Sequence, residues 1–299
     1  MKILLLGRNG QVGWELQRAL APLGEVVGCD FDTPGDLQAD FSRPESLPAL
    51  IQRVQPDAIV NAAAHTAVDK AESEPELAQA INATAPGVLA HEAAALGVPL
   101  VHYSTDYVFD GSGSAPRDEG AATGPLSVYG RTKLEGEALI RASGCRHLIL
   151  RTSWVYAARG GNFARTMLRL AAEREVLRVI DDQIGAPTGA DLLADVSAHA
   201  LRQLLAQPAL SGTYHCVAGG ETSWHGYARF VIEWARTRGH DIKVAPAAIE
   251  PITTADYPTP ARRPLNSRLA TGRLQQAFGL ALPHWQAGVE RMLTEVLGH

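Results

Sequence analysis

The beginning of the sequence constrains the fold more than any other part. The apolar run at residues 3–6 is followed directly by Gly7, Gly10 and Gly13, and then by apolar residues at helical spacing. Between a strand and a helix, glycines at this spacing permit a tight turn, approach of a pyrophosphate to the backbone, and close packing of helix on strand. The free N–H groups at the start of such a helix attract phosphates. The pattern predicts a dinucleotide-binding loop, and the alternative is a plain structural turn.

Short apolar runs alternate with amphipathic stretches through the first half of the chain. The runs lie at residues 3–6, 26–28, 58–62, 100–104 and 148–150. Their length and continuous apolar character are typical of strands buried on both faces of a parallel sheet. Alternation of such strands with helices predicts an α/β fold with a Rossmann-type, doubly wound parallel sheet.

The regular alternation of strand and helix patterns ends after residue 151. Helical patterns cover residues 162–174, 191–206, 224–238 and 285–297, and strand patterns cover 176–180 and 214–217. Residues 245–268 contain five prolines, which predicts a mostly irregular segment. We therefore expect an NAD(P)-binding domain at residues 1–151 and a smaller, partly interleaved α/β substrate domain at 152–299. Elements near 176–190 and 212–220 are candidates to return to the first sheet.

Charge and composition exclude several classes of protein. The net charge is −5 and the isoelectric point is about 6.1, which argues against non-specific nucleic-acid binding. No apolar run has the length of a signal-peptide core or a membrane span. Cys29, Cys145 and Cys216 show no metal-binding spacing and are expected to be reduced. A cytoplasmic protein that binds a small molecule is predicted, and any anionic ligand needs locally placed cations.

Tyr129 and Lys133 are the residues that most sharply indicate chemistry. Four positions apart on a helix, their side chains share one face. A free tyrosine has a pKa of about 10, and a neighbouring ammonium lowers it towards the range useful for proton transfer. With the glycine loop upstream, the pair predicts an acid–base tyrosine beside a dinucleotide. The alternative is a packed tyrosine and a lysine that share a helix face by chance.

Polar residues end the predicted strands where an open parallel sheet binds its ligands. Thr105 or Ser104 is placed to donate a hydrogen bond to a carbonyl oxygen beside Tyr129, although either could be only a strand-end cap. Asp30 ends the second strand, where an acid can accept hydrogen bonds from the adenosine ribose, which favours NADH. Arg8 could instead pair with a 2′-phosphate, so NADPH stays open.

Five longer strings carry a resemblance to a known family. They are residues 61–72 (NAAAHTAVDKAE), 103–110 (YSTDYVFD), 151–156 (RTSWVY), 182–188 (DQIGAPT) and 257–264 (YPTPARRP). With the glycine loop and the Tyr129–Lys133 pair, they resemble the extended short-chain dehydrogenases/reductases, and among these the dTDP-4-dehydrorhamnose reductases. The resemblance covers residues 1 to about 297. It implies NAD(P)H-dependent reduction of the C4 ketone of dTDP-4-dehydro-β-L-rhamnose to dTDP-β-L-rhamnose, the last step of dTDP-L-rhamnose biosynthesis.

The resemblance also implies roles for individual residues. Tyr129 would protonate the C4 oxygen, Lys133 would hold the nicotinamide ribose and lower the Tyr129 pKa, and Thr105 would stand where the superfamily usually has serine. The implied cofactor site consists of Gly7, Gly10, Gln11, Val12, Gly13, Asp30, Asp40, Phe41, Ala64, His65, Thr66, Tyr129 and Lys133. The implied substrate site consists of Thr105, Asp106, Trp154, Asn162, Gln183 and Arg263, the last beside Arg262.

Some members of the family hold Mg²⁺ with acidic residues at a dimer contact. Glu15 and Glu295 match that pattern, and Asp191 stands where a glutamate would be expected. The resemblance thus suggests a homodimer and a Mg²⁺ site, although the Tyr–Lys chemistry needs no metal. Two rival functions stay open: a reductase or epimerase for another nucleotide-linked keto sugar, and a non-catalytic nucleotide-binding subunit. Intact Thr105, Tyr129 and Lys133 argue against the second.

Overall fold

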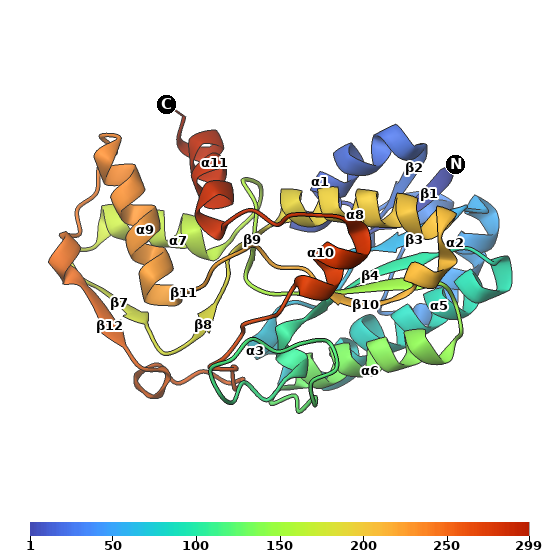
Figure 1. Ribbon diagram of the computed structural model, residues 1–299, viewed down its shortest axis with the longest axis horizontal. Coiled ribbons are helices and arrows are strands. Elements are labelled where there is room, and N and C mark those ends of the chain that lie inside the picture. Colours follow the sequence, from blue (N-terminus) through green and yellow to red (C-terminus); the bar gives the residue numbers. More distant parts are fainter. Residues whose placement is uncertain (299) are drawn as a thin grey trace.

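A six-stranded parallel sheet forms the centre of the computed structural model, which describes residues 1–298 (Figure 1). The strand order is β10-β5-β4-β3-β1-β2, and every neighbouring pair is parallel. The strands are β1 (Lys2–Leu6), β2 (Glu25–Cys29), β3 (Ala58–Asn61), β4 (Leu100–Thr105), β5 (His147–Thr152) and β10 (Gly212–His215). The order reverses at β1, as in a doubly wound sheet, so the predicted fold class is confirmed.

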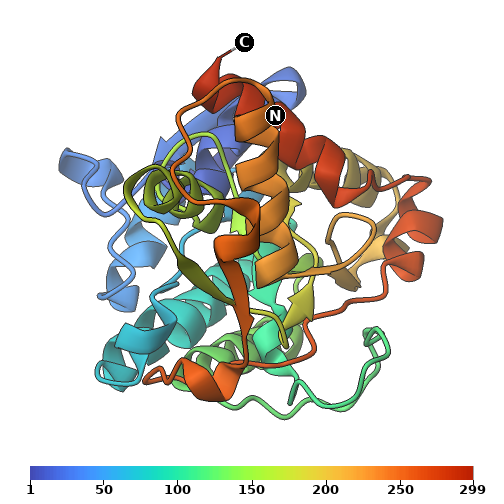
Figure 2. The same ribbon diagram turned by 90° about the vertical axis from the view of Figure 1, so that its left-hand side faces the viewer.

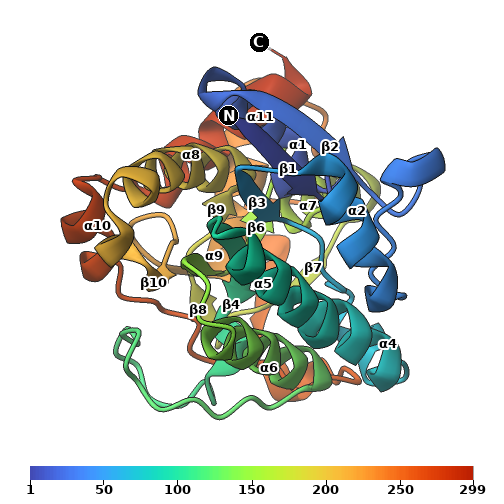
Figure 3. The same cartoon turned by 90° about the vertical axis from the view of Figure 1, so that its right-hand side faces the viewer.

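Helices cover both faces of this sheet, as Figure 3 shows from the sheet's end of the molecule. One face packs against α1 (Gln11–Leu20), α8 (Ala190–Ala206) and α10 (Gly272–Phe278). The other packs against α2 (Leu47–Val54), α5 (Ala85–Leu96) and α6 (Val128–Ala142). Short helices α3 (Val68–Ala71) and α4 (Pro75–Gln79), with a π-helical turn at Ala80–Thr84, lead into α5. Burial on both faces explains the continuous apolar runs of the strands.

A second, smaller lobe lies beyond the carboxyl ends of the strands and faces the viewer in Figure 2. It contains α7 (Phe163–Glu173), α9 (Trp224–Thr237) and α11 (Trp285–Leu297). Its paired strands are β7 (Leu177–Ile180) with β12 (Ile249–Ile252), β8 (Ile184–Gly185) with β11 (Thr222–Ser223), and β6 (Val155–Tyr156) with β9 (Thr188–Gly189). None of the helices within residues 1–298 has both the length and the apolar character of a bilayer-spanning segment.

The later elements agree with the sequence-based expectations only in part. Of the two segments considered for a return to the first sheet, 212–220 does return: its strand, expected at 214–217, is β10, which begins at Gly212 and pairs with β5. The strands within 176–190 pair in the second lobe instead. The segment at 245–268, expected to be mostly irregular, contains strand β12, which pairs in parallel with β7. Pro251 lies within β12 and can do so because a strand with a single neighbour leaves one side free of hydrogen-bonding demands.

Candidate functional site

The glycine loop presents bare backbone at the start of α1. Gly10 is the residue before the helix, and no side chain caps the first helical N–H groups. Gly7 has φ +80°, and a Cβ atom on Gly13 would lie 1.9 Å from the Gly7 carbonyl oxygen. Neither position accepts a side chain without moving the backbone. The local structure is therefore a cradle of free N–H groups suited to a pyrophosphate.

A cavity of about 430 Å³ opens in front of this loop, at the carboxyl ends of the sheet strands. It brings together many of the residues that the sequence singled out: Gly10, Gln11, Val12, Ala64, Thr66, Thr105, Asp106, Tyr129, Lys133 and Trp154. The first strands and α1 contribute the loop side, β4 contributes Thr105, and α6 contributes Tyr129 and Lys133. We call this the sheet-edge cavity.

Tyr129 is held as a protonated phenol. Burial raises its pKa to about 12, and the neighbouring Thr105 hydroxyl offsets part of that rise. The Tyr107 ring meets the Tyr129 ring edge-on, with centroids 5.4 Å apart. The sequence suggested a pKa lowered by Lys133, whereas burial, with the charge of Asp106, shifts the Tyr129 pKa in the opposite direction.

The Lys133 side chain turns into the protein interior. The residue is 2% exposed, and its Nζ lies 2.5 Å from the Tyr103 carbonyl oxygen and 3.2 Å from His102 Nε2. Burial lowers the pKa of Lys133 to about 8. Lys133 therefore lies one turn along α6 from Tyr129, but both contacts of its nitrogen are with β4.

Asp106 adds a carboxyl group with spare hydrogen-bonding capacity. Its Oδ1 accepts from the Thr105 hydroxyl at 3.1 Å, and its Oδ2 is buried without a partner. Burial raises the pKa of Asp106 to about 6, and the hydroxyls of Ser267 and Thr105 offset part of that rise. A buried, unpaired carboxyl oxygen at a cavity is suited to a polar ligand.

Two tryptophans stack where the sheet-edge cavity meets the second lobe. Trp154 has φ +49°, a left-handed conformation that is strained for a bulky residue. Its ring stacks on Trp224 at a centroid distance of 3.7 Å. The Trp224 Nε1–H donates to Gln183 Oε1 at 3.1 Å, which fixes the outer ring.

A neighbouring cavity of about 520 Å³ shares Tyr107 and Trp224 with the sheet-edge cavity. Gln183 and Arg263, both predicted from the sequence, line it. Arg263 is held by Asp69 of α3 through two hydrogen bonds, at 3.0 and 2.8 Å. A cation and stacked aromatic rings at the junction of the lobes suit a ligand that is both anionic and planar.

Several predicted residues lie outside both cavity linings. Asp30 accepts from the N–H groups of Asn9 and Phe31 at 3.0 and 2.8 Å, beside the glycine loop. Asp40 binds Ser42 and Arg43, and Phe41 is buried in the core behind the sheet. His65 faces Glu74 at 3.6 Å. Asn162 caps α7 by accepting from the Arg165 N–H, so its amide serves the helix.

The three acidic residues considered for Mg²⁺ do not form a metal centre. Glu15, Asp191 and Glu295 line one small cavity together with Arg291. Arg291 lies 3.4 Å from Asp191, and Arg18 lies 3.6 Å from Glu15. Within residues 1–298, no group of three or more His, Cys, Asp or Glu side chains could hold a metal ion. The Mg²⁺ site expected at a contact between two chains stays a prediction.

Sequence reasoning missed three residues of this region: His102, Tyr107 and Trp224. Tyr107 and Trp224 line both cavities, and His102 contacts Lys133. Tyr107 follows the strand-end Thr-Asp pair, which could have indicated it. Trp224 begins a helix in the second lobe, and nothing in the sequence connects it with Trp154.

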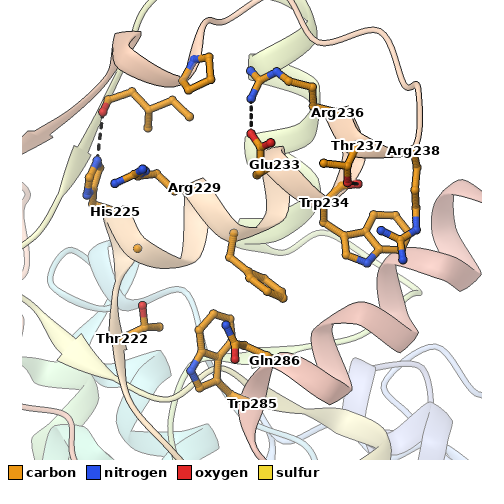
Figure 4. Close-up of a pocket in the computed structure, with 14 residues that line it drawn as sticks. Thr222, His225, Arg229, Glu233, Trp234, Arg236, Thr237, Arg238, Trp285 and Gln286 are labelled. Atoms are coloured by element: carbon orange, nitrogen blue, oxygen red, sulfur yellow. Dashed lines mark hydrogen bonds and ion pairs between the residues drawn. The ribbon is translucent and has the colours of Figure 1, made fainter.

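A larger hollow of about 790 Å³ lies along the outer side of α9 (Figure 4). It is lined by none of the residues predicted for the site. Arg236 donates to Glu233 at 2.6 Å, and Arg238 lies over the Trp234 ring at 3.8 Å, so these charged groups satisfy one another. The hollow is a surface feature of the second lobe with no converging reactive groups.

Comparison with known proteins is consistent along the whole chain. Residues 1–297 match the family model described as the RmlD substrate binding domain. The dTDP-4-dehydrorhamnose reductase of Shigella flexneri is 57% identical over 296 residues, covering 99% of this chain and 98% of that protein. The crystal structure of a dTDP-4-dehydrorhamnose reductase from Clostridium acetobutylicum has a TM-score of 0.88 at 36% identity, covering 99% of both chains. The Bacillus anthracis enzyme in complex with NADP has a TM-score of 0.86 at 32% identity, covering 98% of this chain and 99% of that one.

Proposed function

The chain belongs to the dTDP-4-dehydrorhamnose reductase family, and from this premise we propose which of its residues carry the reaction. It is an oxidoreductase that converts dTDP-4-dehydro-β-L-rhamnose to dTDP-β-L-rhamnose, the last step of dTDP-L-rhamnose biosynthesis. When bound, the dihydronicotinamide of NAD(P)H supplies the hydride to C4. We assign residues 1–151, with the returning elements α8, β10 and α10, to the dinucleotide and the rest of residues 152–299 to the sugar nucleotide.

In the proposed mechanism, Tyr129 donates its proton to the C4 oxygen as the ketone is reduced. Its raised pKa keeps the phenol protonated at neutral pH, as a proton donor requires. Thr105 turns its hydroxyl proton from Asp106 Oδ1 to the same oxygen, and Asp106 accepts from a sugar hydroxyl through its unpartnered Oδ2. Lys133 holds the nicotinamide ribose and stabilises the phenolate that forms. No step requires a metal.

The proposed substrate pose runs from the sheet-edge cavity into the neighbouring one. Trp154 packs on the deoxysugar, and Gln183 and Arg263 contact the nucleotide diphosphate. The backbone cradle of Gly7, Gly10 and Gly13 takes the cofactor pyrophosphate. The other members of the expected sites, Asn162 included, stay predictions.

We propose that the enzyme accepts both NADH and NADPH. Asp30 is fixed at the end of β2, where it can accept from ribose hydroxyls. Arg8 lies along Gly28, donates to the Gly28 carbonyl oxygen at 3.2 Å, and its buried Nε has no partner. That guanidinium is the cation available for a 2′-phosphate. Arg8→Ala should lower kcat/KM for NADPH more than for NADH.

Cellular setting and assembly belong to the same proposal. Three free, buried cysteines suit the reducing cytoplasm. The homodimer follows from the resemblance alone, and sedimentation equilibrium of the purified chain tests it.

One observation carries the proposed mechanism: Tyr129, Lys133, Thr105 and Asp106 line a single cavity with the glycine loop. Tyr129→Phe tests it, because this change removes one hydroxyl. We expect kcat to fall by roughly 10²–10⁴-fold, with NADPH binding, followed by nicotinamide fluorescence, within about twofold. A variant that turns over within tenfold of the unmodified enzyme would exclude Tyr129 as the proton donor.

A further inference from the structure

Lys133 is buried without a counter-ion. Glu137 lies one turn further along α6 and its charge offsets part of the lowering of the Lys133 pKa, but its oxygens are occupied by Ser104, Arg141 and Arg151. The other ionisable groups around the lysine are His102 on β4 and Tyr129 on α6, with Asp106 beyond Tyr129. Within residues 1–298, Lys133 makes no ion pair. A buried ammonium in such surroundings is costly, so the neutral amine is more accessible than in a free lysine.

The His102 ring is oriented by Asn61 on the adjacent strand. The Asn61 Oδ1 accepts from the Ala63 N–H at 3.0 Å, so the amide nitrogen faces His102 Nδ1 at 3.1 Å. An amide nitrogen only donates, hence Nδ1 accepts and the ring proton sits on Nε2. Nε2–H then points at Lys133 Nζ, 3.2 Å away.

This arrangement is satisfied by one protonation state of the lysine. An ammonium has no lone pair to receive the Nε2–H, whereas an amine accepts from His102 and donates to the Tyr103 carbonyl oxygen. Burial independently lowers the pKa of His102 well below its usual value and that of Lys133 to about 8.

We propose that His102 is a positioning residue that stabilises the neutral form of Lys133 in the free enzyme, and that cofactor binding draws the lysine to the nicotinamide ribose and favours its ammonium form, with net proton uptake that grows as the pH rises. The inference rests on the proposed role of Lys133. The proton comes from solvent and forms the fourth bond on Nζ, and His102 keeps its own. The phosphates of the dinucleotide favour the charged form. Cofactor binding thereby raises the fraction of ammonium at the place where it can stabilise the Tyr129 phenolate.

The test is calorimetric titration of the full chain with NADH in buffers of different ionisation enthalpy, from pH 7.0 to 8.5. NADH is used because it lacks a titrating 2′-phosphate. A group with a pKa of about 8 is about one-tenth neutral at pH 7.0 and about three-quarters neutral at pH 8.5. Proton uptake should rise between those values. Uptake that is absent or independent of pH overturns the proposal.

Asn61→Asp is the discriminating variant. A carboxylate of the same size accepts from Nδ1–H, moves the ring proton, and presents the Nε2 lone pair to an ammonium. Uptake at pH 8.5 should fall at least threefold, and the alkaline limb of kcat/KM should move up by about one pH unit. His102→Gln, which offers an amide oxygen, should act in the same direction and serves if Asn61→Asp does not fold.

His147→Gln is the matched control. This histidine begins β5, two residues before the register partner of His102, and its ring contacts the Cys145 carbonyl oxygen instead of Lys133. Uptake and pH profile should equal those of the unmodified enzyme. If Asn61→Asp and His102→Gln both keep the original profile, His102 has no such role. Turnover retained by Tyr129→Phe and Lys133→Met would instead refute the proposed function, so the two failures are distinguishable.

Discussion

Two ionisable side chains on the buried side of α6 are treated in opposite ways. The carboxylate of Glu137, fully buried, accepts from Ser104, Arg141 and Arg151. Lys133, one turn earlier, has a carbonyl oxygen and a histidine but no opposite charge. A buried ionisable group whose hydrogen-bond and charge partners are all present stabilises the fold. A buried group that lacks a partner of opposite charge is available to interact with a ligand. Burial alone therefore does not separate structure from chemistry, but the completeness of the partner set does.

Lys133→Met should show the contrast between Lys133 and Glu137 most clearly. We expect kcat to fall by roughly 10²–10⁴-fold, because the ribose contact and the charge beside Tyr129 are lost. The free energy of unfolding should stay equal or rise, because an uncompensated amine leaves the interior. Steady-state kinetics and urea unfolding measure the two quantities. A large loss of stability would place Lys133 with Glu137 as a structural group.

Glu137→Gln should lower stability and leave turnover nearly unchanged, the reverse of Lys133→Met. Removing the charge leaves Arg151 buried without its partner, which is expected to cost about 3–5 kcal/mol of unfolding free energy. The kcat of the folded enzyme at pH 7 should stay within about threefold. Glu173→Gln is the control, because its exposed pair with Arg169 is expected to contribute at most about 0.5 kcal/mol. Equal losses in both variants would contradict the assignment.

Asp106 extends the comparison of buried ionisable groups to the pH dependence of stability. Its pKa is raised from 3.8 to about 6 in the folded state, so the native protein binds this proton more tightly than the unfolded chain. The group therefore lowers stability as pH rises from about 4 to about 6, by about 2–3 kcal/mol, and its effect is constant above about pH 7. Asp106→Asn should be more stable than the unmodified enzyme at pH 7 but not at pH 4. Urea unfolding at both values measures this, and a pH-independent difference would argue against it.

Arg263→Lys should produce the smallest effect. The Arg263–Asp69 pair is partly exposed, so its loss should cost at most about 1 kcal/mol of stability. Lysine cannot keep the two-pronged contact with Asp69, and we expect KM for the sugar nucleotide to rise about tenfold with kcat nearly unchanged. Initial rates at varied substrate concentration test this. A change confined to kcat would remove Arg263 from the binding site.

Most of the fold was predictable because the strands of the first sheet are buried on both faces. Such strands produce short, continuous apolar runs, and the runs at 3–6 and 100–104 fall within β1 and β4. The pairing of β12 with β7 was not predictable, because the prolines of that segment favour irregular structure. The return of residues 212–220 to the first sheet was anticipated, but the register of β10 with β5 was not, since it depends on contacts between distant parts of the chain.

For the site, the sequence indicated the residues whose spacing is local. Tyr129 and Lys133 share one helix, and the three glycines share one loop, so their patterns are visible along the chain. The environment of Lys133 was not visible, because His102 and Asn61 come from separate strands and meet it only in three dimensions. The direction of the Tyr129 pKa was hidden for a similar reason, because it depends on how deeply the folded chain buries the phenol.

The return of β10 to the first sheet has a mechanical consequence. The chain leaves the sheet after β5, comes back through α8 and β10, leaves again for α9, and comes back once more through α10 before α11. Two lobes that are joined by several crossings of one polypeptide cannot rotate about a single hinge. The entrance to the sheet-edge cavity is therefore expected to be rigid. Side chains such as the stacked tryptophans, and not a separation of the two lobes, should control access to it.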